Sequence, residues 1–125
     1  MSIRNPSPRG GRAASLVPRA KVWLETEGGT YVFGLGMSTI LQAVERAGAI
    51  KQAAADLGKS YRHVWSRIKE AERALGRPLV ESRVGGQGTR RSCLTPEARR
   101  LVAAFLAFRG RLLRRLPREF GRCFD

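Results

Sequence analysis

The stretch IKQAAADLGKSYRHVWSRIKEAERAL, residues 50–75, decides the fold class. Residues 50–57 predict a short helix whose small alanine side chains let a neighbouring helix approach closely. Gly58 then interrupts the pattern, and Ser60 is a residue type that favours the N-cap of a helix. The apolar residues that follow recur at the i, i+3, i+4, i+7 spacing of an amphipathic helix. Two helices joined by so short a turn predict a helix-turn-helix.

The sequence before this stretch predicts a hairpin and one more helix. Residues 21–33 place apolar side chains two apart on both sides of Gly28-Gly29, whose glycines suit the positive φ of a tight turn. Residues 38–47 carry an apolar face at helical spacing, and Gly48 ends the predicted helix.

The sequence after it predicts a β-ribbon and a long last helix. Residues 78–83 and 91–94 read as two short strands around a glycine-rich loop. Thr95 is a favourable N-cap followed by Pro96 at the first helical position, and Pro117 is predicted to end this helix. The whole order predicts a mainly α fold with small β elements, a winged helix-turn-helix with an N-terminal β-hairpin and a long C-terminal helix.

A chain of 125 residues supports one domain. Residues 1–20 are rich in Pro, Gly, Ser and Arg and predict a disordered basic arm, which either attracts phosphates or is merely a solvated terminus. Residues 21–116 form the predicted DNA-binding domain, and residues 117–125 a C-terminal tail.

The net charge of +14 points to a polyanionic partner. Residues 1–21 and 96–125 each contribute +5, so the middle of the chain carries only +4 and specificity must come from a few well-placed residues. No apolar stretch is long enough for a membrane span or leads from the basic start as a secretion signal. Two cysteines and one histidine are too few for common metal centres. We therefore expect a cytoplasmic protein with no cofactor, metal or membrane partner.

The helix at about 60–75 has the side chains of a DNA-recognition helix. Opposite its apolar stripe lie Arg62, Ser66, Lys69 and Arg73. Because the major groove of DNA admits an α-helix, we predict that this face reads double-stranded DNA, with an Arg62 fork on a guanine edge and Ser66 as a second base contact. Lys59, Ser60 and Arg67 are expected on phosphates, as are Lys51 and Gln52 of the preceding helix. The full predicted set on the recognition helix is Lys59, Ser60, Tyr61, Arg62, His63, Ser66 and Arg67. For any single one of them, a solvated charged surface is the alternative.

Trp65 lies at the edge of the apolar stripe. We interpret it as a core or boundary aromatic in preference to a DNA-facing one.

The loop between the two strands, residues 83–91, predicts a wing. Its glycines allow close approach to a ligand, and we expect Arg83, Gln87, Arg90 and Arg91 along the DNA backbone or in the minor groove. A plain structural hairpin is the alternative.

Residues 48–55 and 59–65 together resemble the winged-helix domain of molybdate-responsive ModE-type regulators. Residues 77–83 and the Gly85-Gly86 tip continue the likeness, which extends over about residues 21–115. The LysR-type DNA-binding domain is similar over the same stretch, more distantly. The resemblance implies a bacterial transcription regulator that binds palindromic operators as a homodimer.

Three departures from the ModE pattern bear on function. Ala49 stands where the family usually has a serine cap, and Thr89-Arg90-Arg91 replaces further glycines of the wing. Full-length members carry molybdate-binding domains after the winged helix, for which 125 residues leave no room. We therefore expect a stand-alone form with no small-molecule ligand in this chain.

The last helix favours dimerisation on its own pattern. Its apolar residues fall on two stripes, of which one can seal the core and the other can meet a second subunit. The predicted interface consists of Val102, Phe105, Leu106 and Leu113.

Two other functions remain open alternatives. A winged helix can serve as a protein- or RNA-contact module without specific DNA readout. Gly85-Gly86-Gln87 also matches the tripeptide of release-factor peptidyl-tRNA hydrolases. Because no nucleophile, His and acid set stands out, we predict that the chain is not an enzyme.

Overall fold

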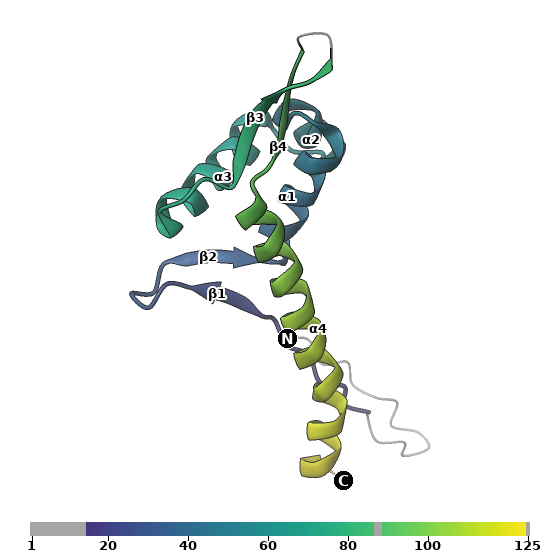
Figure 1. Cartoon of the computed structure of the whole chain (residues 1–125). Coiled ribbons are helices and arrows are strands. Elements are labelled where there is room, and N and C mark those ends of the chain that lie inside the picture. Colours follow the sequence, from purple (N-terminus) through teal and green to yellow (C-terminus); the bar gives the residue numbers. More distant parts are fainter. Residues whose placement is uncertain (1–14, 87–88, 125) are drawn as a thin grey trace.

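The computed structural model describes residues 15–86 and 89–124 and shows a small helical domain with two β-hairpins and one long helix extending from it (Figure 1). The predicted winged helix-turn-helix is confirmed. The elements are β1 (Trp23–Glu25), β2 (Tyr31–Gly34), α1 (Leu35–Ala47), α2 (Ile50–Leu57), α3 (Tyr61–Leu75), β3 (Val80–Val84), β4 (Arg90–Leu94) and α4 (Pro96–Phe124).

The core lies between α1, α2, α3 and the first turns of α4. Buried apolar side chains from these helices and from β2 form one cluster, with Phe33 and Phe105 packed edge to face at a centroid distance of 5.3 Å. This aromatic pair joins the N-terminal hairpin to α4. Burial of the large rings stabilises the domain mainly by removing apolar surface from water.

The helix-turn-helix forms where the sequence predicts it. The backbone of Gly58 has φ +68°, a left-handed conformation in which a side chain would be strained, and this ends α2. The predicted N-cap is confirmed, because the Ser60 hydroxyl accepts a hydrogen bond from the N–H of His63 at 3.0 Å. The axis of α3 is therefore set within three residues of the end of α2.

The wing is an antiparallel pair with Val80 opposite Leu94 and Val84 opposite Arg90. Its strand β4 is also attached to the helices along its other edge. The N–H of Ser92 donates to the carbonyl of Gly48 at 2.8 Å, and the N–H of Leu94 donates to Glu45 Oε1 at 2.8 Å. The wing is thus fixed to the end of α1.

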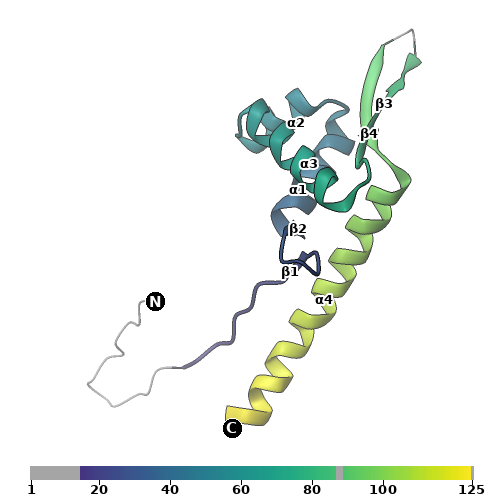
Figure 2. The same cartoon turned by 90° about the vertical axis from the view of Figure 1, so that its left-hand side faces the viewer.

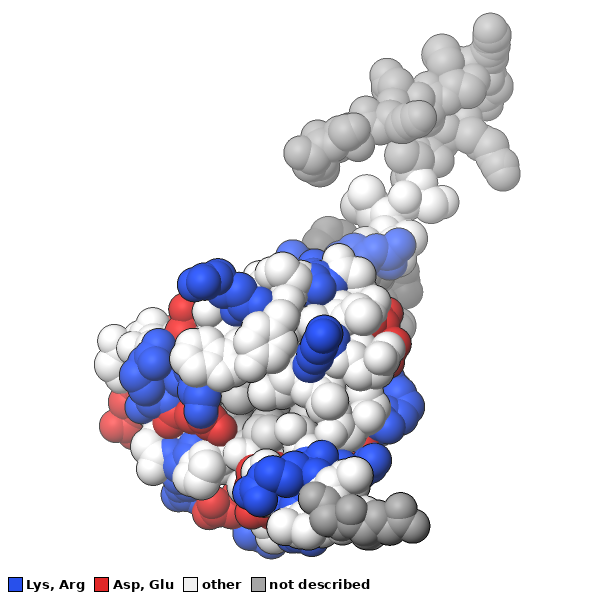
Figure 3. Space-filling model, turned by 90° about the horizontal axis from the view of Figure 1, so that it is seen from above, with Lys and Arg blue, Asp and Glu red and all other residues white. Residues whose placement is uncertain are grey.

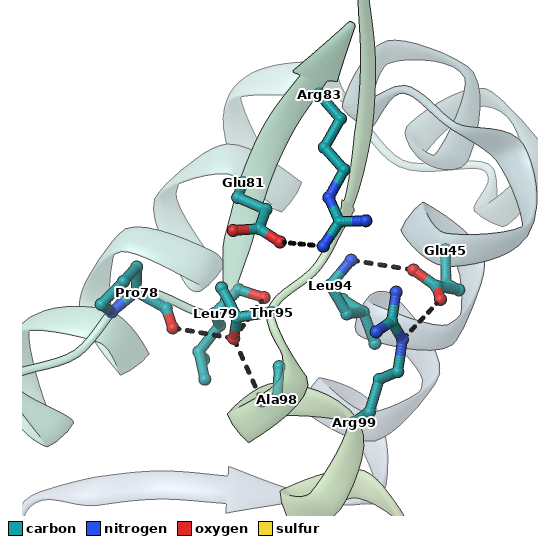
Figure 4. A network of polar contacts seen from close by, with 9 residues as sticks. All are labelled: Glu45, Pro78, Leu79, Glu81, Arg83, Leu94, Thr95, Ala98 and Arg99. Atoms are coloured by element: carbon teal, nitrogen blue, oxygen red, sulfur yellow. Dashed lines mark hydrogen bonds and ion pairs between the residues drawn. The ribbon is translucent and has the colours of Figure 1, made fainter. Parts of the chain in front are cut away.

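Glu45 and Thr95 connect the wing base to α4 (Figure 4). The second oxygen of Glu45 accepts from Arg99 Nε at 2.9 Å. The Leu94 N–H, together with Arg99, holds the pKa of Glu45 below its ordinary value of 4.5, against an opposing effect of burial. Thr95 caps α4 by accepting from the N–H of Ala98 at 3.1 Å, as predicted, and its hydroxyl donates to the carbonyl of Pro78.

The prediction that Pro117 ends the last helix is wrong, because α4 continues to Phe124 with Pro117 inside it. A proline inside a helix removes one backbone donor, and its ring crowds the carbonyl four residues earlier, so it weakens the helix without necessarily ending it. The residues after it support the helix, since Phe120 and Phe124 stack at 4.6 Å and Arg122 pairs with Glu119 at 3.7 Å. The predicted tail is therefore helical as far as residue 124, and the end of α4 projects well beyond the rest of the domain (Figure 2).

Helix α1 begins at Leu35, three residues before its predicted start. Residues 1–14 of the predicted arm and Gln87 of the predicted wing lie outside the described residues.

Among the residues that are described, no helix is both long and apolar enough to cross a membrane.

Candidate nucleic-acid interface

Helix α3 buries one face and presents the other to solvent. Val64, Ile68 and Ala71 are buried in the core. Arg62 is exposed on the opposite side and Ser66 is half-buried there. Within the part of the chain that the structure describes, neither side chain has a hydrogen bond or ion pair to another residue. Their donors are thus free for an external ligand.

The start of α3 carries no negative charge. Its first turn has no acidic residue, and the first carboxylate along the helix is that of Glu70. Lys59, Tyr61 and His63 are all exposed at this end. The hydroxyl of Ser60 is occupied as the helix cap, so its role in the free protein is structural. This end of the helix suits an anionic partner.

Two cations of α3 are held by the protein itself. The Arg67 guanidinium lies over the ring of Tyr31, with Cζ 5.6 Å from the centroid, so it attaches α3 to the N-terminal hairpin. The Lys69 ammonium pairs with Glu72 at 3.3 Å and lies 5.6 Å from the centroid of the Trp65 ring. Helical spacing does not connect Arg67 with Tyr31, so the sequence could not show that contact. The Lys69 contacts, with Glu72 at i+3 and Trp65 at i−4, are at helical spacing, and that spacing was the signal for them.

On α2, Lys51 and Gln52 are both exposed in the first turn. The side-chain amide of Gln52 donates to Asp56 at 2.8 Å, one turn further along. Lys51 is therefore the freer phosphate candidate of the two.

The wing arginines have different surroundings. Arg83 pairs with Glu81 at 3.0 Å, and this hydrogen bond raises the pKa of the guanidinium. The Arg91 guanidinium lies against Gly48 at the end of α1. The contact is so close that a Cβ built on Gly48 would lie 2.6 Å from the guanidinium carbon of Arg91. Arg90, on the other face of the ribbon, is exposed and has no partner among the described residues. Of the three described wing cations, Arg90 is the one not engaged within the domain.

The predicted dimer residues do not share one exposed surface. Val102 and Phe105 are 8% and 1% exposed, so they seal the core and offer almost no area to a second subunit. The prediction of Val102 and Phe105 as dimer residues needs correction, because both side chains are packed in the core of the domain. Leu106 and Leu113 are half-buried.

The exposed large apolar side chains of α4 all follow Phe105, the last buried residue of the helix. They are Phe108, Leu112 and Phe124, which are 47%, 41% and 64% exposed.

Lys and Arg side chains are spread across the face seen from above in Figure 3, with Asp and Glu mostly toward its margins. Among the described residues, no cluster of three or more His, Cys, Asp and Glu side chains is placed to hold a metal ion.

Residues 37–99, which run from α1 through the helix-turn-helix and wing into α4, match the bacterial regulatory helix-turn-helix proteins of the lysR family. The chain belongs to this family. The resemblance of the sequence to LysR-type domains, a family of bacterial regulatory helix-turn-helix proteins, is thereby confirmed. The ModE proteins among the relatives below confirm the likeness to ModE-type proteins.

Several relatives of this LysR-family chain carry molybdenum-related names. It is 33% identical over 66 residues to the molybdenum-pterin-binding protein MopB of Rhodobacter capsulatus, covering 53% of this chain and 24% of MopB. It is 32% identical over 80 residues to the molybdenum transport protein ModE of Herbaspirillum seropedicae, covering 64% of this chain and 30% of that protein. The transcriptional regulator ModE of Haemophilus influenzae is 30% identical over 66 residues, which cover 53% of this chain and 26% of that protein. The chain thus spans about a quarter to a third of the length of the curated relatives it matches.

Among solved structures, the LysR-family fold is shared with the protein chain of the BenM_DBD/catB site 1 DNA complex. The TM-score is 0.50 at 18% identity, over 74% of this chain and 98% of that one. This likeness shows a common fold.

Proposed function

We propose that this chain is a transcription regulator, not an enzyme, that binds double-stranded DNA with sequence specificity. One observation carries the proposal: the exposed side of α3 offers Arg62 and Ser66 with free donors, on a helix whose first turn has no acidic residue. A rigid helix with unoccupied donors on one face and a buried opposite face is what major-groove readout requires.

In this arrangement α3 lies in the major groove. Arg62 donates its fork to guanine O6 and N7, and Ser66 contacts an adjacent base edge. Lys51 and Lys59, at the starts of α2 and α3, bind phosphates and position the helix without specifying sequence. Arg90 reaches the backbone or minor groove from the wing, and Arg91 supports the wing base from its position at Gly48.

We further propose that the chain acts as a homodimer on two half-sites. Because Val102 and Phe105 are buried in the core, the interface we propose uses the exposed apolar side chains further along α4, Phe108 and Leu112. Half-buried Leu113 follows directly after Leu112 and borders this surface. Exposed apolar groups of this size on a projecting helix are typical of an interface with another subunit.

Selection of bound duplexes from a random pool tests the function, with the full chain and with residues 1–20 removed. Specific readout predicts enriched duplexes with two related half-sites about one helical turn apart, for both proteins. Enrichment that disappears when the arm is removed would assign the sequence preference to residues 1–20 and not to α3. No enrichment with either protein would refute specific readout, and it is the result that a module for protein or RNA contact would give.

A matched pair of variants locates the reading face. Arg62→Ala should reduce affinity for the selected duplex roughly 5- to 150-fold and relax the preference at one position, the range for loss of one bidentate base contact. Arg100→Ala removes another exposed positive charge, from α4, and should leave the sequence preference unchanged. If both variants lose affinity equally for all duplexes, the reading face is not on α3.

A further inference from the structure

Two large aromatic side chains are exposed at the start of α3. Tyr61 is 50% exposed and Trp65 is 41% exposed. They are four positions apart in the sequence, which places both rings on the same side of the helix. The aliphatic residues of the apolar stripe, such as Val64, are buried, so this pair is set apart from the core.

The Trp65 indole is fixed by a chain of polar contacts that begins at the wing. Glu72, whose side chain is 13% exposed, accepts the N–H groups of Leu79 at 2.8 Å and Val80 at 3.2 Å. Its other oxygen pairs with the Lys69 ammonium at 3.3 Å, and that ammonium lies 5.6 Å from the Trp65 centroid. The exposed indole thus has a cation beside it that is itself paired with a half-buried carboxylate bound to the base of the wing.

The neighbourhood of the indole combines apolar surface with positive charge. Arg62 and Trp65 are three residues apart and therefore about 60° apart around the helix axis. Lys59 precedes the pair, and no carboxylate stands in the first turn of the helix. An apolar surface among cations fits a polyanion that also presents apolar groups, and in the major groove that group is the C5-methyl of thymine.

We propose that Trp65 contacts a thymine methyl group beside the base pair read by Arg62, and so selects an A·T pair at that position of the half-site. This inference rests on the proposed DNA-binding function. It adds a specificity-determining residue outside the polar face of the helix, and it gives Lys69 and Glu72 the task of positioning the indole.

Replacement of thymine by uracil tests the contact, because it removes the methyl group and nothing else. Each thymine of the selected duplex is replaced in turn. At one position the native chain should lose about 4-fold in affinity, the worth of one buried methyl-sized group. The Trp65→Ala variant should bind both duplexes equally at that position. An equal uracil effect in native and variant proteins, or a loss in the variant that is uniform over all duplexes, would overturn the methyl contact.

Fluorescence provides a second measurement on the folded protein. The chain has two tryptophans, so Trp23→Phe leaves Trp65 as the single emitter. Acrylamide quenching of this variant should fall when the selected duplex is added. The converse variant, Trp65→Phe, reports from Trp23 on β1 and should show no change. Unprotected Trp65 fluorescence in the bound complex would refute the inference.

The two proposals fail in different ways. If no duplex is enriched from the random pool, the proposed function is wrong and the thymine contact falls with it. If a duplex is enriched and depends on Arg62, but uracil sensitivity does not depend on Trp65, only the thymine contact is wrong. Circular dichroism melting of Trp65→Ala and Trp65→Phe verifies that each variant is folded at the assay temperature.

Discussion

Replacement of Glu45 by alanine should destabilise the domain more than its partly exposed position suggests. The carboxylate connects three elements, because it lies on α1, accepts from the Leu94 N–H of β4 and accepts from Arg99 of α4. Removal leaves the N–H of a buried residue without its acceptor, and a hydrogen bond to a charged group is worth about 1.5–3 kcal/mol. The ion pair with Arg99 adds only about 0.2–1 kcal/mol, since both side chains are more than a third exposed.

The net expectation for Glu45→Ala, after allowance for water reaching the Leu94 N–H, is a loss of about 2 kcal/mol in the free energy of unfolding. For a domain of this size that corresponds to a fall of roughly 8–16 °C in Tm. Thermal and urea unfolding by circular dichroism, at one fixed protein concentration, measure the loss.

Arg99→Ala is the matched control for this prediction. It removes the ion pair but keeps the Leu94 hydrogen bond, so it should cost less than about 1 kcal/mol. Equal losses for Glu45→Ala and Arg99→Ala would refute the reasoning, because the main contribution is assigned to the backbone hydrogen bond.

Four further predictions follow from single contacts. The pKa of Glu45 is lowered in the folded state, so the carboxylate stabilises the fold fully above its ordinary pKa of 4.5, and this stabilisation is lost as the pH falls through the lowered pKa. The difference in unfolding free energy between the native and Glu45→Ala proteins, measured by urea titration, should therefore shrink in acid. Phe105→Ala should cost about 3–5 kcal/mol of stability, because the ring is buried against the core. Phe108→Ala should change the melting temperature of the monomer little and weaken self-association in sedimentation equilibrium, whereas an unchanged association constant would remove Phe108 from the proposed interface. Ser60→Ala should cost about 0.5–2 kcal/mol through loss of the α3 cap, measured by urea unfolding.

Local sequence signals predicted the helix-turn-helix because each signal acts within a few residues. Ser60 caps α3 from three residues away, and Gly58 supplies the left-handed conformation of the turn itself. Thr95 caps α4 in the same local way. Capping residues and glycines with positive φ depend little on the rest of the fold, so single-sequence reasoning recovers them.

The surroundings of the charged side chains were much less predictable. The ring under Arg67 belongs to a hairpin 36 residues earlier in the sequence, and Arg91 lies against Gly48, 43 residues earlier. No periodicity relates such positions, so the sequence shows only that these arginines are cations. The structure separates cations held by the domain from those free for a ligand.

The choice of dimer residues on α4 failed for a different reason. Apolar residues recur along the whole helix, but which of them meet the core depends on how far the rest of the domain extends along it. Packing against Phe33 buries Phe105, whereas Leu112, seven residues later on the same side of the helix, lies beyond the core and is exposed. Trp65 illustrates the same limit, because edge residues of a stripe are assigned to core or surface only by their neighbours.

The attachment of β4 to the end of α1 also bears on aggregation. A strand at the border of a two-stranded ribbon ordinarily presents a row of open amides, which can pair with a strand of another molecule. Here the outward amides of Ser92 and Leu94 are taken by a turn carbonyl and a carboxylate. The wing can therefore extend from the domain toward a ligand while this part of its border is closed to strand addition.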